Sequence, residues 1–309
     1  MKVKKDTSFF SFFIEAIKIS SKGILPIWSL VAFIWGITST FMDFSNFSLF
    51  YIILLSLSAA LSLALLIKAM VDIKRETIEF GFGEDSSFFV MKNDFTVNME
   101  RLLSAEENRE KDFYFAMGID RSLDVSISTK KGVFFSVLEF LIQNYGLSSE
   151  NVQALIDKAR ENQFPQKNVL DYGDTLVVKI DSENKKGFYL LLVANSEKRE
   201  EAKISNNMEL VKGEDSRIII LRLFEKCESL NCENLVLGAF GTNGLKFPYA
   251  VIVTEIINAY AKNRLTLNDS YPKNVYLSVR KEDMTRHHLS HSDIVLYIQR
   301  VSRFYAKKQ

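Results

Sequence analysis

The amino-acid sequence predicts an α/β domain preceded by a two-helix transmembrane hairpin. Two observations support this organisation. Near the N-terminus, two long stretches carry no charged residue, which is the pattern of helices that cross a lipid bilayer. From about Ile78 onward, short strand-like runs alternate with helical runs, and such alternation is typical of α/β domains. The 309 residues provide room for about two domains.

The hairpin is predicted from residues 24–41 and 47–67, which read ILPIWSLVAFIWGITSTF and FSLFYIILLSLSAALSLALLI. A helix needs about 20 largely apolar residues to span a bilayer core, and the second stretch meets this length. A signal peptide would be shorter and nearer the N-terminus, and a buried hairpin of a soluble protein would show a polar face. We therefore expect a transmembrane hairpin over residues 23–70, with its helices antiparallel because the connection is short.

Basic residues flank both ends of the expected hairpin. They are Lys2, Lys4, Lys5, Lys18 and Lys22 before it and Lys68, Lys74 and Arg75 after it. The connection contains Asp43 and neither Lys nor Arg, so the positive-inside rule places both ends in the cytosol. We expect residues 1–22 to form a basic, amphipathic juxtamembrane segment and residues 77–309 to form a cytosolic domain.

The second apolar stretch carries small residues at four-residue spacing, namely Ser56, Ala60 and Ala64. Small residues at this spacing let two helices approach closely in lipid, which favours a face for association between chains. The alternative is that Ser and Ala are simply frequent in such stretches.

The domain after the hairpin is predicted from apolar runs bounded by polar turns. The expected strands are Phe88–Met91, Phe113–Met117, Thr175–Ile180, Phe188–Ala194, Leu235–Leu237 and Asn274–Val279. The expected helices are Gly132–Gln143, Glu150–Asn162, Asp215–Ser229, Tyr249–Ala261 and Asp293–Tyr305.

The composition limits the classes of function. The net charge of +1 provides no field that would attract nucleic acid. The two cysteines, Cys227 and Cys232, form neither a disulfide framework nor a metal-binding spacing, which fits a reducing compartment. We expect both to be small, buried apolar side chains.

The three histidines lie together in the stretch from His287 to His291. A metal site is conceivable, because His288 and His291 would lie one turn apart on a helix. The interpretation that we favour is a polar loop in which Ser290 or Ser292 caps the last helix. We expect no bound metal.

A glycine-rich stretch precedes the helix expected at Tyr249. It reads LGAFGTNGL from Leu237 to Leu245. One interpretation is a tight connection, because Gly adopts positive φ at little steric cost. The other is a cradle of backbone N–H groups that binds a phosphate at the start of a helix.

Three stretches, in this order, resemble those of a known family. They are Phe88–Phe95, a strand ending in Asn93-Asp94-Phe95; Phe113–Asp124, a strand that leads into a polar loop; and the glycine-rich stretch. The sequence resembles a macro domain, an α/β/α fold that binds ADP-ribose. It resembles in particular the membrane-anchored macro domain of Thoeris antiphage defence effectors, which implies a macro-like three-layer α/β/α domain with a mixed sheet.

The match is residue by residue only in part. Gly173-Asp174-Thr175-Leu176 approximates a Gly-Thr strand start of that subfamily. Asp120, Leu123 and Val125 stand where the subfamily usually has Asn, Phe and Thr.

The resemblance implies a ligand-binding site at these positions. Asp94 is expected to accept a hydrogen bond from the adenine amino group, and the backbone N–H groups of Phe240–Gly244 are expected to wrap the diphosphate. Asp120, Arg121 and Asp124 are expected near the distal ribose. The expected ligand-binding residues are Asp94, Phe95, Asp120, Arg121, Asp124, Gly238, Ala239, Phe240, Gly241, Thr242, Asn243, Gly244 and Leu245.

The resemblance also implies a function, that of an antiviral effector integral to the bacterial cytoplasmic membrane. Its domain would bind an ADP-ribose-derived signal, such as a histidine–ADP-ribose conjugate made by a TIR-domain enzyme. Binding would trigger homo-oligomerisation and disruption of the membrane lipids. We expect no nucleic-acid partner, no cofactor and no catalytic residue. The alternative is a membrane-tethered ADP-ribosyl hydrolase in which Asp120 and Asp124 activate a water.

Overall fold

The computed structural model describes residues 17, 24–34, 48–74, 77–82, 85–125, 132–182, 185–196, 213–239, 248–266 and 271–306. The chain divides into two compact units. The first comprises Met1–Arg75 and Ser290–Leu296, and the second comprises Glu76–Leu289 and Tyr297–Gln309.

The first unit contains a helix over residues 24–34 and the long helix α2 (Ser48–Lys74). The indole Nε1 of Trp28 donates a hydrogen bond to the Ser62 hydroxyl at 3.1 Å. Ser58, one turn before Ser62, is buried, and its hydroxyl donates to the backbone of α2 itself. The Ser58–Ser62 side of α2 therefore faces the helix 24–34.

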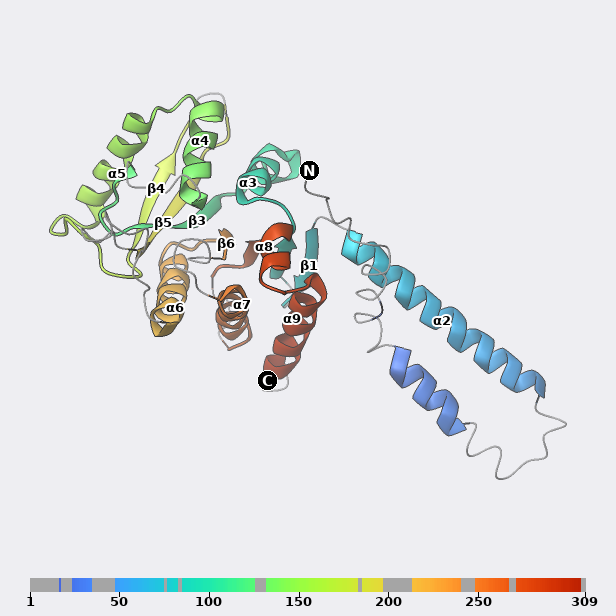
Figure 1. The fold of residues 1–309 in the computed structure, drawn as a ribbon. Helices are drawn as coiled ribbons and strands as arrows, with labels where there is room; N and C mark the ends of the chain where they lie inside the picture. The colour runs from blue at the N-terminus through green and yellow to red at the C-terminus, as the bar shows by residue number, and fades with distance from the viewer. Residues whose placement is uncertain are drawn as a thin grey trace, which may run out of the picture. The chain divides into compact units, whose positions relative to one another are not determined.

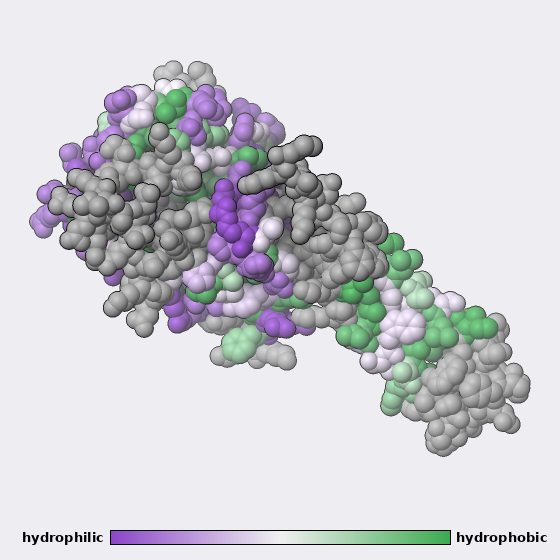
Figure 2. Space-filling view, in the orientation of Figure 1, coloured by the Kyte–Doolittle hydropathy of each residue, from purple (hydrophilic) through white to green (hydrophobic). Residues whose placement is uncertain are grey.

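A different side of α2 carries the small residues predicted to associate. Ser56, Ala60 and Ala64 are all exposed, and so are most of the large apolar side chains described in this unit. Figure 2 shows these helices as a largely hydrophobic surface.

The predicted transmembrane hairpin is contradicted. Within the residues that the structure describes, no helix combines the length and the apolar character that crossing a membrane requires. The expectations of a hairpin over 23–70 and of an integral cytoplasmic-membrane protein with cytosolic N-terminus and domain are therefore wrong, and residues 1–22 lie outside the described residues apart from Ile17.

The second unit is built on a mixed sheet, as predicted, and this sheet has seven strands, one more than expected (Figure 1). The strand order is β1-β2-β7-β6-β3-β5-β4. The strands from β2 to β5 in this order are parallel, while β1 and β4 pair antiparallel at the two edges. The strands are β1 (Thr77–Gly81), β2 (Ser87–Met91), β3 (Phe113–Asp120), β4 (Thr175–Ile180), β5 (Phe188–Ser196), β6 (Asn234–Gly238) and β7 (Asn274–Ser278).

Helices pack on both faces of this sheet (Figure 1). The helices of this unit are α3 (Phe95–Ser104), the short 3-10 helix η2 (Glu106–Asn108), α4 (Val133–Tyr145), α5 (Ser149–Gln163), α6 (Gly213–Ser229), α7 (Tyr249–Thr266), α8 (Lys281–Arg286) and, from Tyr297 onward, α9 (His291–Ala306). One core cluster joins α3, α4 and α5 to alternate strand residues such as Leu190, Leu192 and Val236. On the opposite face, the ring of Tyr260 on α7 lies 5.4 Å from that of Phe88 on β2, and α6 contacts β5.

Local sequence signals account for several of these elements. β3 reads FYFAMGID, and most of its residues are buried, as expected of a parallel strand covered on both faces. α4 ends at Gly146, whose φ of 66° is the left-handed conformation that terminates helices. α5 begins with a capping box, in which the Ser148 hydroxyl accepts from the Asn151 N–H at 3.2 Å and the Asn151 side chain accepts from the Ser148 N–H at 3.1 Å.

The histidine stretch and the two cysteines take part in the packing of the fold. The Ser290 hydroxyl accepts from the Asp293 N–H at 3.2 Å, so the predicted cap of α9 is confirmed. The imidazole of His287 stacks on the ring of Tyr249, with centroids 5.4 Å apart. Cys227 and Cys232 are free and buried, as predicted.

Candidate functional site

The parallel strands bring their carboxyl ends to one edge of the sheet. β2 is followed there by Asp94, β7 by Arg280 and β6 by Ala239, while β3 ends at Asp120. Ligands of open α/β sheets bind at this edge, because helices cover the faces and the connecting loops leave a crevice beyond the strand ends. A ligand of this sheet would therefore bind at the carboxyl edge.

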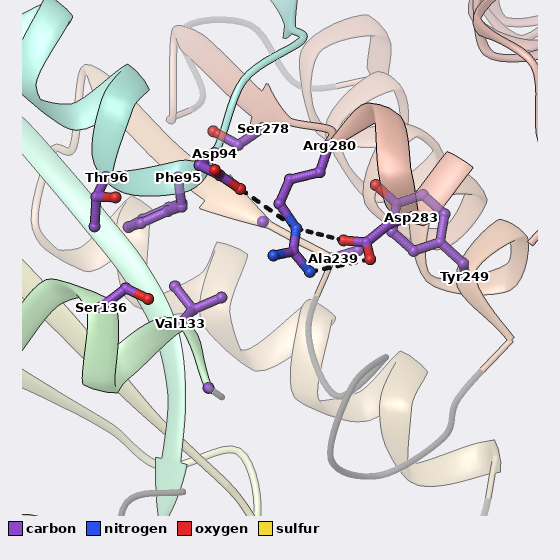
Figure 3. Close-up of a pocket in the computed structure, with 12 residues that line it drawn as sticks. Asp94, Phe95, Thr96, Val133, Ser136, Ala239, Tyr249, Ser278, Arg280 and Asp283 are labelled. Atoms are coloured by element: carbon purple, nitrogen blue, oxygen red, sulfur yellow. Dashed lines mark hydrogen bonds and ion pairs between the residues drawn. The ribbon is translucent and has the colours of Figure 1, made fainter. Parts of the chain in front are cut away.

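A pocket of about 170 Å³ lies at this edge (Figure 3). Its wall combines the turn after β2, the first turn of α4 and the ends of β6 and β7. The lining residues are Asp94, Phe95, Thr96, Gly132, Val133, Ser136, Gly238, Ala239, Tyr249, Ser278, Arg280 and Asp283.

Asp94 immediately precedes α3 and presents its carboxylate to the pocket. A residue at this position usually caps the helix with its side chain, but Asp94 makes no side-chain capping hydrogen bond. Its side chain is 58% exposed, and the Arg280 Nε lies 3.5 Å from its Oδ1. The carboxylate is therefore turned toward the pocket, where it can accept hydrogen bonds from a ligand.

Arg280 is held rigidly on the other side of the pocket. Its Nε donates to Asp283 Oδ2 at 2.8 Å, and its Nη2 donates to Asp283 Oδ1 at 3.0 Å. The Asp283 side chain is only 8% exposed, and hydrogen bonding to it raises the pKa of Arg280. This two-point pairing fixes the plane of a permanently charged guanidinium.

A buried amide ties the two sides of the pocket together. Asn98 on α3 is fully buried, and its Nδ2 donates to the Asn93 carbonyl at 3.1 Å and to the Ser278 hydroxyl at 2.9 Å. Asn93 precedes Asp94, and Ser278 ends the strand that leads to Arg280. The buried hydrogen bonds thus tie the turn that carries Asp94 to the end of the strand that leads to Arg280.

Tyr249 closes the pocket beside Asp283. Burial is the first cause that raises the pKa of its phenol, followed by the Asp283 charge. The phenol is therefore neutral at physiological pH and offers a hydrogen-bond donor rather than a base.

The structure brings together four of the residues expected to bind ligand. Asp94, Phe95, Gly238 and Ala239 line the pocket. The expected residues Phe240, Gly241, Thr242, Asn243, Gly244 and Leu245 lie outside the described residues. Asp120, Arg121 and Asp124 are described, but they are not among the residues that line this pocket.

Asp120 is separated from Asp94 by the strand order. β7 and β6 lie between β2 and β3, so the two strand ends are about 14 Å apart at 4.7–4.9 Å per strand. The Asp120 Oδ1 accepts from the backbone N–H and the hydroxyl of Ser122 at 2.9 and 2.7 Å. Its Oδ2 is buried, and no described residue donates to it.

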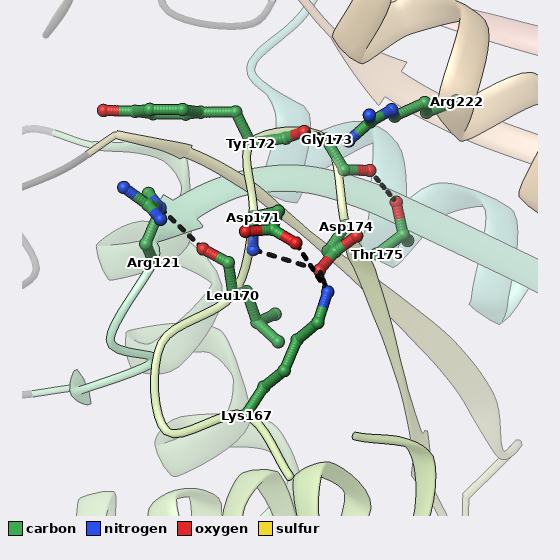
Figure 4. A network of polar contacts seen from close by, with 9 residues as sticks. All are labelled: Arg121, Lys167, Leu170, Asp171, Tyr172, Gly173, Asp174, Thr175 and Arg222. Carbon is green, nitrogen blue, oxygen red and sulfur yellow. Dashed lines mark hydrogen bonds and ion pairs between the residues drawn. The ribbon is translucent and has the colours of Figure 1, made fainter. Parts of the chain in front are cut away.

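Arg121 holds the loop between α5 and β4 (Figure 4). Its Nε donates to the Leu170 carbonyl at 2.6 Å, and its guanidinium lies 4.5 Å from the centre of the Tyr172 ring. In the same loop, Lys167 donates to Asp171 at 2.7 Å and to Asp174 at 2.8 Å. Arg121 is thus engaged with its own chain.

Sequence reasoning missed most of the polar wall of the pocket. Ser278 lies within the strand expected at 274–279, and Arg280 and Asp283 follow it. A charged residue just after a buried strand was the available signal. That signal had been used for Asp94 after β2. Nothing in the sequence indicates that β7 pairs with β2, which brings the end of β7 beside Asp94.

Comparisons with known proteins add a similarity of fold. No protein-family model and no curated protein matches the sequence. Among solved structures, the chain is similar to an Oceanobacillus iheyensis macrodomain with ADP, with 10% identity and a TM-score of 0.44 over 75% of this chain and 98% of that one. A mutant of that macrodomain with ADPR gives 9% identity and a TM-score of 0.45 over 75% and 100%.

A third similar structure is Thermosipho africanus DarTG in complex with ADP-ribose. Its identity is 11% and its TM-score is 0.37, over 65% of this chain and 43% of that one. None of these similarities reaches a TM-score of 0.5, so the ligand of the pocket has to follow from the residues of the pocket.

Proposed function

We propose that the pocket at the carboxyl edge binds an ADP-ribose-derived ligand. One observation carries the proposal. The exposed Asp94 carboxylate, which makes no capping hydrogen bond to α3, lies beside the Arg280 guanidinium, and Asp283 holds that guanidinium in a fixed plane. The ligand class is the one that the sequence resemblance implies.

The adenine would occupy the space between Asp94 and Arg280. The Asp94 carboxylate accepts from the exocyclic amino group, and the N–H groups of the first turn of α3, which have no partner within the helix, donate to ring nitrogens. The fixed guanidinium offers its face to the base, because Arg stacks on aromatic rings. Binding would replace the present 3.5 Å contact between Arg280 and Asp94.

The diphosphate would lie next to the start of α4. Gly132 precedes this helix and has no side chain that could cap it. It lines the pocket together with Val133 and Ser136. The first N–H groups of a helix and its positive end favour a phosphate. Ala239, which belongs to the glycine-rich stretch of the sequence, is on the same wall.

The biological role proposed for this binding is that of a sensor. A TIR-domain partner enzyme would make the ligand in antiphage defence, as the resemblance implies, and binding would promote self-association. Ser56, Ala60 and Ala64, which are exposed on α2, are the proposed contact between copies. A ligand can drive such association only if the associated state binds it more tightly.

The test is isothermal titration calorimetry of the full chain with ADP-ribose. Asp94→Ala should weaken binding by about 1.5–3 kcal/mol, which is the usual contribution of a hydrogen bond to a charged group. Asp112→Ala is the matched control, because this exposed aspartate precedes β3 and so lies at the amino ends of the parallel strands, away from the pocket. Equal affinities of the wild type and Asp94→Ala would place the ligand elsewhere.

A second experiment, an incubation with the ligand followed by mass spectrometry, separates the sensor from the alternative hydrolase. ADP-ribose and an ADP-ribosyl conjugate should be recovered intact after incubation, as judged by mass spectrometry. Release of the conjugated group by the wild type would favour the hydrolase.

A further inference from the structure

A second cavity lies away from the carboxyl-edge pocket, among α6, α7 and α9. Its volume is about 430 Å³, which is within the range of cavities that bind ligands. Its residues all belong to the second unit and share none with the first pocket. We call this cavity the helical groove.

The floor of the helical groove is one face of α7. Glu255, Asn258, Ala259 and Lys262 line it, and their spacing of three, four and seven residues places them along one side of a helix. Ala259 leaves the floor hollow because its side chain is small. The Tyr297 hydroxyl on α9 donates to Asn258 Oδ1 at 3.0 Å, so the floor is tied to one wall.

The walls come from the helices on either side. Ile220 of α6 and Val301 of α9 are buried at the base of the walls. Phe304 of α9 stands on the rim and is 58% exposed. Ala259, Ile220 and Val301 thus form an apolar base between the polar side chains of the floor. An apolar base flanked by polar side chains suits the apolar face of another helix.

The charges around the groove are unequal in sign. Arg217, Lys262 and Arg300 line it from three different helices, and Glu255 is the one carboxylate among the described lining residues. The Arg217 Nε lies 3.6 Å from Glu255 Oε2, and the Arg217 side chain is 71% exposed. An excess of positive charge therefore surrounds an apolar base.

We propose that the helical groove docks an acidic, amphipathic helix of a partner protein. Apolar side chains at helical spacing would fill the space above Ala259 and contact Phe304. Carboxylates flanking this stripe would face Arg300 and Lys262, and complementary charges of this kind set partner choice and raise the association rate. The apolar base favours a helix over nucleic acid, which binds mainly through phosphates.

The experiment selects binders from a displayed library of helix-forming peptides on the immobilised full chain. Fluorescence anisotropy then measures the affinity of the enriched peptides. The expected sequences have apolar residues at i, i+3 or i+4 and i+7, with Asp and Glu beside them. Arg300→Glu should weaken their binding by about 10-fold or more, because it replaces attraction by repulsion.

Arg303→Glu is the matched control. It makes the same charge change on the exposed surface of the same helix, but Arg303 does not line the groove. Its effect should stay within about 3-fold, as for charges on a rim. The proposal is overturned if no peptide is enriched, if the enriched peptides lack the acidic amphipathic pattern, or if both variants lose affinity equally. Binding of anionic phosphatidylglycerol vesicles that depends on Arg300, without an enriched peptide, would overturn it in favour of a lipid surface.

Discussion

Two arginines near the carboxyl edge of the sheet are held in different ways. Arg280 is paired with the buried carboxylate of Asp283 and faces a pocket. Arg121 is bound to a backbone carbonyl and lies over the Tyr172 ring in a loop. Sequence reasoning expected Arg121 at the ligand and did not consider Arg280. The comparison teaches that the partners of a charged side chain, which come from distant parts of the chain, decide between binding a ligand and holding a loop.

Among the variants that compare the surroundings of the two arginines, the largest effect is expected at Asp283. Asp283→Ala should raise the Kd for ADP-ribose by about 10- to 100-fold, the equivalent of one charged hydrogen bond in free energy. The released guanidinium loses its fixed plane and is free to pair more closely with Asp94, which then competes with the ligand. Calorimetry gives the Kd, and circular dichroism checks the fold. Glu282→Ala, at the exposed neighbouring position, should leave the Kd unchanged, and an unchanged Kd for Asp283→Ala would mean that Arg280 has no part in binding.

A smaller effect, of a different kind, is expected at Arg121. Arg121→Met keeps the aliphatic stem but removes the donor to Leu170, and it should lower the free energy of unfolding by about 1 kcal/mol. The Kd for ADP-ribose should remain within about 2-fold. Urea unfolding and calorimetry measure the two quantities, with Arg109→Met as the control on an exposed surface. A weaker Kd at full stability would instead restore the ligand-binding role expected from the sequence.

The smallest effect is expected at Lys167 in the same loop. Hydrogen bonds to Asp171 and then Asp174 raise the pKa of Lys167, and the hydrogen bond from Lys167 lowers the pKa of Asp171. The lysine contribution to stability is complete below its ordinary pKa of 10.5 and is lost as the pH rises through the raised value. The aspartate contribution is complete above its ordinary pKa of 3.8 and is lost as the pH falls through the lowered value.

Lys167→Met should therefore destabilise the chain slightly at neutral pH, and the difference from the wild type should shrink at both extremes. Urea unfolding at about pH 3, 7 and 11 measures it, with the exposed Lys158→Met as the control. A difference that stays constant across this range would show that the ion pairs make no contribution.

The success of sequence reasoning differed from element to element. The strands β2 to β7 were predicted because each is a largely apolar run, and in the inner strands burial on both faces removes polar residues. The edge strand β1 was missed, since its residues are half-buried or exposed and, among the described strands, it pairs with β2 alone. α3 was also missed, although its buried residues Phe95, Asn98, Met99 and Leu102 have helical spacing and would have indicated it.

The hairpin, in contrast to β1 and α3, was predicted but is contradicted by the structure. Two uncharged stretches predicted membrane spans, but no helix within the described residues meets the required length and apolar character. The apolar side chains of these helices are real and exposed.

The sequence by itself determined where the buried strands lie, that Asp94 follows one of them, and that the last helix begins with a serine cap. Only the tertiary structure decided which strand ends become neighbours. The order β1-β2-β7-β6-β3-β5-β4 puts Arg280 beside Asp94 and keeps Asp120 apart from both. The physical reason is that hydrophobic periodicity specifies which face of a strand is buried, whereas strand order depends on backbone hydrogen bonds that any sequence of suitable burial can form, and on packing between residues far apart in the chain.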